Sequence, residues 1–133
     1  MTGETDLGRL IGSMQPLLQP DIMVFATIPP GGTLPQDVEP LMVFREAEGT
    51  TLILREGDAQ TAGLAGSYRC RMITLAIHSS LEAVGFLAAV TTALAAAGIS
   101  VNPVSAFHHD HLFVPADRAG EAMDVLVDLS SRR

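Results

Sequence analysis

The sequence predicts an α+β protein built from two tandem ferredoxin-like units, with antiparallel sheet and helices on one side. From residue 70 onward the expected order of elements is strand, helix, strand, strand, helix, which is most of a split βαβ unit. Segments 50–62 and 110–122 repeat a strand-then-helix layout at an offset of 60 residues. The 133 residues, 47% of them hydrophobic, are enough to bury a core. Two small, mutually dependent units therefore fit the chain.

The first unit is expected over residues 1–67 and the second over 68–133. A proline- and glycine-rich loop around Gly31 and Gly32 stands where the first helix of this plan would be, so we expect the first unit to be degenerate. The elements expected in it are a short helix at 5–15, a strand at 21–30, two short strands within 40–56 joined across Glu48 and Gly49, and a brief helix at about 56–63.

The second unit is expected to begin with a strand at 71–78, since apolar residues alternate along it. Ser79 and Glu82 have the spacing of a capping box, which predicts that the following helix starts at Ser79. Gly98 is expected to end that helix. The remaining elements are strands within 99–107 and 111–115 and a last helix at 116–131.

The helix that ends at Gly98 carries two apolar stripes, one with Leu87 and Leu94 and the other with Phe86 and Val90. Two stripes predict two buried faces, one against the sheet and one against another partner. We therefore expect a homodimer or a higher homo-oligomer.

Charge and composition exclude several classes of partner. All 8 basic residues are arginine, and 15 acidic residues leave a net charge of -7, which disfavours nucleic acid and anionic membrane surfaces. The uncharged stretch from Ala83 to Phe107 raises the question of a membrane span. A helix at 83–97 would reach only about 22 Å, against about 30 Å of hydrocarbon, so a buried soluble helix is favoured. The single cysteine and the acidic N-terminus favour a cytoplasmic protein.

The segments HSSLEAVG (78–85) and HDHLFVP (109–115) carry a family resemblance. With them, nearly the whole chain resembles the small stand-alone bacterial proteins that have two tandem ACT units. Elsewhere, ACT domains are regulatory modules that bind amino acids, often at interfaces between paired domains. The resemblance implies a small-molecule ligand, with an amino acid as the leading class.

By position, the resemblance implies a ligand loop before the helix and a further contact from Asn102 on the next strand. The loop lacks the Asp-x-Pro-Gly form of many amino-acid-responsive ACT domains, and no catalytic domain is fused to it. The loop residues are His78, Ser79, Ser80, Leu81, Glu82, Ala83, Val84 and Gly85.

The loop could suit an amino acid on physical grounds. Amides at a helix N-terminus favour a carboxylate, Gly85 permits close approach of the backbone, and Glu82 could neutralise an ammonium group. The alternative is that Ser79 and Glu82 only cap the helix, and that Gly85 only lets it pack closely on a strand.

Three histidines and an aspartate occupy positions 108–111. Strand geometry puts His109 and His111 on one face and Asp110 on the other. The histidine pair could contact the ligand, a neighbouring subunit or a divalent metal, or could belong to a solvated hairpin tip. A third metal ligand is not evident in the sequence, so we assign no metal site, no cofactor and no catalytic residue.

Cys70 lies between Arg69 and Arg71. The two cations could lower the pKa of its thiol and make it reactive, or the small side chain could simply pack in the strand.

The function predicted from the sequence is a non-enzymatic regulatory module that binds a small molecule, with an amino acid as the expected ligand. The alternative is a protein-interaction or structural adaptor without a small ligand. A small metal-dependent enzyme that uses His109 and His111 is the third hypothesis.

Overall fold

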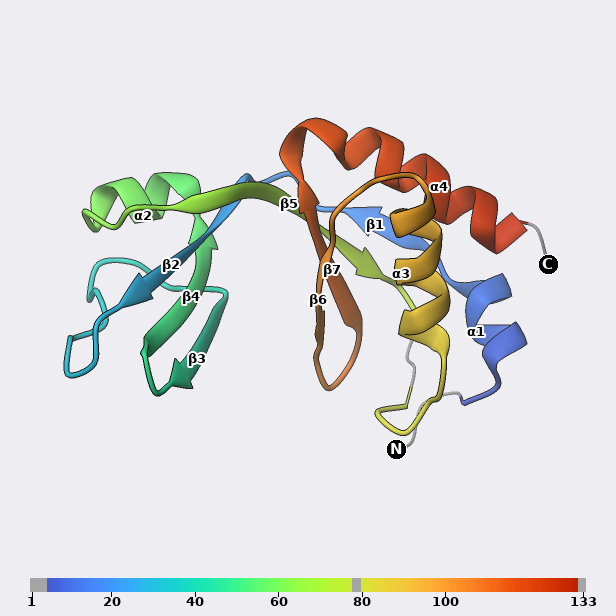
Figure 1. Ribbon diagram of the computed structural model, residues 1–133, viewed down its shortest axis with the longest axis horizontal. Coiled ribbons are helices and arrows are strands. Elements are labelled where there is room, and N and C mark those ends of the chain that lie inside the picture. Colours follow the sequence, from blue (N-terminus) through green and yellow to red (C-terminus); the bar gives the residue numbers. More distant parts are fainter. Residues whose placement is uncertain (1–4, 78–79, 132–133) are drawn as a thin grey trace. The chain divides into compact units, whose positions relative to one another are not determined.

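The computed structural model describes residues 5–77 and 80–131. The chain folds as two compact units (Figure 1). We call Met1–Pro20 together with Arg71–Arg133 the terminal unit, since it contains both ends of the chain, and Asp21–Cys70 the central unit. The sequence divides the chain into 1–67 and 68–133, whereas in the structure residues 5–20 belong to the terminal unit.

The terminal unit has a four-stranded arrangement in the order β1-β5-β7-β6. β1 pairs antiparallel with β5, where Leu17 lies opposite Thr74, and β6 pairs antiparallel with β7, where Val104 lies opposite His111. Its elements are α1 (Leu7–Ser13), β1 (Pro16–Leu18), residues 71–75 of β5 (Ser67–Leu75), α3 (Phe86–Ala96), β6 (Asn102–Ser105), β7 (Asp110–Pro115), a 3-10 turn at Ala116–Arg118 and α4 (Ala119–Ser131).

Alternation along the strands builds the core of the terminal unit. Ile73 and Leu75 of β5 and Leu112 and Val114 of β7 are fully buried, and they pack against apolar residues of α1, α3 and α4. Side chains at every second position of a strand share a face, so the helices cover one face of these strands (Figure 1). The α+β class and the antiparallel strand pairing are as the sequence predicts.

The central unit has the strand order β3-β4-β2-β5. β2 (Met23–Ile28) pairs antiparallel with β4 (Gly49–Arg55), and β3 (Met42–Glu46) forms a hairpin with β4. Residues 67–70 of β5 complete it, and α2 (Glu56–Thr61) follows β4. The β3–β4 turn is residues 47–48, because Glu46 pairs with Gly49, so it lies one position before the predicted Glu48–Gly49 connection.

Residues 29–41 join β2 to β3 without a helix or a strand. The buried cluster of the central unit is small and consists of Val24, Ala26, Ile28, Leu52, Leu54 and Ala59.

The sequence did not predict β1. This strand is the reason that residues 5–20 belong to the terminal unit. Only three residues form the strand, and proline begins it, which gives a weak strand pattern. Its pairing with β5 ties the N-terminal segment to residues 71–133. In the part of the chain that the structure describes, no helix has both the length and the apolar character needed to cross a bilayer.

Candidate functional site

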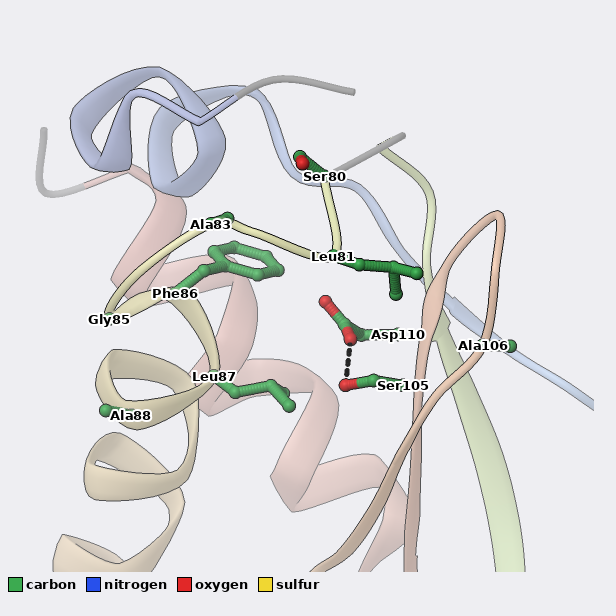
Figure 2. Close-up of a pocket in the computed structure, with 10 residues that line it drawn as sticks. All are labelled: Ser80, Leu81, Ala83, Gly85, Phe86, Leu87, Ala88, Ser105, Ala106 and Asp110. Atoms are coloured by element: carbon green, nitrogen blue, oxygen red, sulfur yellow. Dashed lines mark hydrogen bonds between the residues drawn. The ribbon is translucent and has the colours of Figure 1, made fainter. Parts of the chain in front are cut away.

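A cavity of about 130 Å³ lies in the terminal unit, between residues 80–88 and the β6–β7 hairpin (Figure 2). Its wall combines apolar side chains with the Ser80 hydroxyl on the loop side and the Ser105 hydroxyl and Asp110 carboxylate on the hairpin side. The residues that line it are Ser80, Leu81, Ala83, Gly85, Phe86, Leu87, Ala88, Ser105, Ala106 and Asp110.

The loop side of the cavity is a turn, and the predicted helix start at Ser79 is wrong. The Ser80 hydroxyl accepts a hydrogen bond from the Glu82 N–H at 3.0 Å, and the Ser80 carbonyl accepts one from the Ala83 N–H at 3.0 Å. Such local hydrogen bonds compete with a helix. Gly85 then adopts φ +89°, a left-handed conformation that L-residues other than glycine rarely tolerate, so α3 begins at Phe86.

The first turn of α3 forms the next part of the wall. Its N-cap is Gly85, which has no side chain that could accept hydrogen bonds from the first N–H groups. The Gly85 carbonyl already accepts from the Ala89 N–H at 2.9 Å. Because the N-terminal end of a helix carries partial positive charge, this wall favours a negatively charged group.

Asp110 supplies the charged group on the opposite wall. It lies directly across from Ser105 in the hairpin, and only 7% of its surface is exposed. The Ser105 hydroxyl donates to Oδ1 of Asp110 at 2.6 Å. Alternation along β7 puts Asp110 on the same face as Leu112 and Val114, the face that packs on the helices. Figure 2 shows its carboxylate directed from the hairpin toward the loop and the start of α3.

The histidine pair lies on the other face of β7. His111 Nδ1 is 3.0 Å from the Thr74 hydroxyl, which also accepts from Gln19 Nε2 at 3.2 Å. Burial lowers the pKa of His111, the neighbouring His109 lowers it further, and Asp110 opposes both effects. The His109 and His111 rings are 6.2 Å apart. Among the described residues, no three potential ligands converge on a metal position.

The structure brings together only some of the residues predicted for the site. Of the loop, Ser80, Leu81, Ala83 and Gly85 line the cavity, whereas Glu82 and Val84 are exposed and do not. The predicted His78 and Ser79 lie outside the described residues.

Asn102 does not line the cavity either. It lies opposite Phe113, three residues along β6 from Ser105, and the register puts it on the face away from Asp110. The sequence did not identify Ser105 and Asp110 as a pair in the site. Strand alternation separated Asp110 from the histidines, but it could not show what the face with Asp110 contacts. The alternation of β7 was the available signal.

Cys70 belongs to the central unit and is fully buried. Its thiol donates to the Met23 carbonyl at 3.4 Å. Burial raises the pKa of the thiol to about 11, so the neighbouring arginines do not activate it. Cys70 is a packing residue.

Comparison with known proteins identifies both halves of the chain. Family models described as ACT domain match residues 2–71 and residues 67–128. A Vibrio cholerae protein of unknown function, described as a possible transport protein, is 42% identical, with a TM-score of 0.83 over 93% of this chain and 95% of that one. No curated protein matches the chain.

Two more distant structures share the fold. An Agrobacterium tumefaciens protein is 15% identical, with a TM-score of 0.76 over 88% of this chain and 89% of that one. The ligand-free regulatory subunit of aspartate kinase from Thermus thermophilus is 12% identical, with a TM-score of 0.65 over 86% of this chain and 95% of that one. The tandem arrangement thus occurs in proteins whose sequences have diverged widely.

Proposed function

This chain belongs to the ACT-domain family, and we propose that it is a non-enzymatic regulatory module that binds a small molecule of the amino-acid class. The observation that carries the proposal is the cavity between residues 80–88 and the β6–β7 hairpin. It lies at the loop where the family resemblance places a ligand. The likeness to a regulatory subunit of aspartate kinase supports the regulatory role.

Regulation would follow from the position of the ligand. A molecule in the cavity contacts both the loop before α3 and the β6–β7 hairpin, so it favours the conformations in which these segments lie close together. A partner protein that recognises this arrangement would then bind the ligand-loaded form preferentially.

The proposal gives the central unit a different role. Residues 29–41 form no helix, and the unit has no element equivalent to α3. We regard it as a degenerate ACT unit that supports the fold.

The protein is further proposed to be a cytoplasmic homodimer or higher homo-oligomer. β6 ends the strand order of the terminal unit, and its exposed edge is suited to pairing with another chain. The second apolar stripe of α3 is a weaker argument than the sequence suggested, because α3 already contacts α1 and α4. Light scattering coupled to size-exclusion chromatography measures the mass, and a monomer at all concentrations would contradict this part of the proposal.

Thermal denaturation with each of the twenty amino acids at millimolar concentration tests ligand binding. A ligand at 100 times its Kd adds about 2.7 kcal/mol to the free energy of unfolding, which raises the Tm by roughly 2–8 °C for a protein of this size. If no amino acid raises the Tm, the proposal is wrong.

An adaptor without a small ligand is the second candidate, because three large apolar side chains are exposed near the cavity. Leu81 is 66% exposed, Val84 83% and Phe107 65%. Exposed apolar groups of this kind are typical of protein contacts. If Leu81→Ser and Val84→Ser abolish association with a partner while no amino acid changes the Tm, the adaptor function is favoured.

A further inference from the structure

We propose that Asp110 binds the ammonium group of the ligand, and that the cavity selects amino acids with small uncharged side chains, such as glycine, L-alanine and L-serine. This inference rests on the proposed function and deepens it. It assigns the charge recognition to the hairpin, whereas the sequence pattern assigned it to Glu82 in the loop.

The position of Asp110 supports this role. Asp110 lies in the wall of the cavity with only 7% of its surface exposed, and the Ser105 hydroxyl donates to its carboxylate at 2.6 Å. A carboxylate has about four acceptor positions on its two oxygens, so it can accept from more than one donor at a time. An ammonium group carries three donors and a positive charge, and bonds between two ionised groups are the strongest kind.

Glu82 cannot take this role in the observed conformation. It is exposed, and it is not among the residues that line the cavity. The loop of this chain therefore contributes backbone and small or apolar side chains to the cavity, and Asp110 is the carboxylate among the described residues that line it.

The rest of the wall limits the size and polarity of the ligand. Leu81, Phe86 and Leu87 are large and apolar, and Figure 2 shows them around the Asp110 carboxylate. The volume of about 130 Å³ is well below the roughly 300–1,000 Å³ of sites for drug-sized molecules. Only a ligand with a few heavy atoms can be enclosed, and a second charge on its side chain would lie against apolar surface.

A comparison of ligands with and without an ammonium group distinguishes the role of Asp110 from simple recognition of the ligand carboxylate. L-lactate has the carboxylate and nearly the size of L-alanine, but it carries a hydroxyl in place of the ammonium group. The Asp110 carboxylate attracts L-alanine and offers L-lactate no opposite charge. The preference for L-alanine over L-lactate therefore reports on Asp110.

Isothermal titration calorimetry on the full chain tests the inference, with glycine, L-alanine, L-serine, L-leucine, L-phenylalanine and L-lactate as probes. Asp110→Asn preserves the shape of the side chain and its bond with Ser105 but removes the charge. We expect it to raise the Kd for L-alanine about 10- to 100-fold and to abolish the preference over L-lactate. Asp124→Asn, which removes an exposed carboxylate on α4, is the matched control and should leave both values unchanged.

The size limit is tested by Leu87→Phe, which enlarges a side chain that lines the cavity from the first turn of α3 and points toward Ser105 and Asp110 in Figure 2. We expect it to weaken binding of L-alanine at least 10-fold. Ala95→Leu is the matched control, since Ala95 is exposed on the same helix and does not line the cavity.

Different results overturn the two proposals separately. If none of the five amino acids binds the wild-type chain, the proposed function fails, and this inference with it. If amino acids bind but L-leucine or L-phenylalanine binds as tightly as L-alanine, only the size selection fails. If L-lactate binds the wild type as tightly as L-alanine, or if Asp110→Asn leaves the preference intact, only the role of Asp110 is wrong. The wild-type comparison decides this even if Asp110→Asn does not fold.

Discussion

The terminal and central units share a strand arrangement and differ in how two corresponding strands are joined. In the terminal unit, β5 and β6 are joined by the loop at 80–85 and by α3. In the central unit, β2 and β3 are joined by residues 29–41, which form no helix. The described cavity lies between that connection and the β6–β7 hairpin, which supplies Ser105 and Asp110. The comparison teaches that the candidate site needs the connection with α3 in addition to the strands.

The same difference determines the two cores. Among the described residues, the buried cluster of the terminal unit contains 13 residues, and that of the central unit contains 6. A small cluster with few neighbours can relax around a truncated side chain, whereas a cluster enclosed by three helices leaves a cavity.

The largest expected effect is a difference in the cost of core truncation. Leu94→Ala in α3 should lower the free energy of unfolding by about 3–5 kcal/mol, and Leu54→Ala in β4 by about 2–3 kcal/mol, although both side chains are fully buried. Urea denaturation measures both values. Val127→Ala, at a position 53% exposed on α4, is the control and should change the value by less than about 0.5 kcal/mol. Equal costs for the two leucines would contradict the comparison of the cores.

The buried thiol of Cys70 is expected to make the stability of the folded chain decrease at alkaline pH. Burial raises the pKa of its thiol from the usual 9.0 to about 11 in the folded chain. The stability that this group contributes is therefore complete below pH 9 and is lost as the pH rises through about 11. Denaturation between pH 8 and 11 measures this loss, and Cys70→Ala should remove it. In addition, a thiol reagent at pH 8 should label Cys70 only after urea unfolds the chain, and rapid labelling without urea would contradict the burial.

Substitutions at two glycines test the backbone conformation that the structure gives to each of them. Gly85 has φ +89°, so Gly85→Ala should destabilise the chain by about 1–2 kcal/mol, even though the nearest side chain, Leu7, leaves room for a methyl group. Gly57 lies in α2, and an added methyl would meet nothing within 4 Å. Gly57→Ala should therefore stabilise the chain by about 0.5–1 kcal/mol. Urea denaturation checks the two signs, and a stabilising Gly85→Ala would show that residue 85 is not left-handed.

The smallest expected effect is a loss of stability at acidic pH, caused by His111 in the terminal unit. The pKa of His111 is lowered in the folded chain, chiefly by burial, so the unfolded chain takes up a proton first. This stability is present above the ordinary histidine pKa of about 6.5 and is lost as the pH falls below it. The Tm should decrease from pH 7.5 to 5.5, and His111→Gln should reduce that decrease. The same slope in wild type and variant would contradict this role of His111.

Much of the fold could be predicted because its signals are local. Alternation at Ile73 and Leu75, and the spacing of apolar residues in the last helix, follow directly from the sequence. The start of α3 could not be placed, since the capping-box pattern of Ser79 and Glu82 is also compatible with a turn that ends at a left-handed Gly85.

The candidate site was predicted only in part, for a tertiary reason. The loop at 80–85 could be assigned from the resemblance, and four of its residues line the cavity. Asp110 lies 25 or more residues away from that loop, and only the folding of β7 beside α3 brings it to the cavity. Alternation along β7 predicted that Asp110 and His111 face opposite sides, but it could not reveal which side holds a cavity.

A proton–nitrogen NMR titration of the full chain with L-alanine tests the central claim most directly. The account predicts that amide signals of residues 80–88 and 105–110 shift with one common Kd, while those of residues 29–41 stay in place. Asp110→Asn should displace the same titration to higher concentrations of L-alanine. Shifts confined to the central unit, or the absence of any shift at millimolar L-alanine, would contradict the claim that the loop before α3 and the β6–β7 hairpin form the binding site.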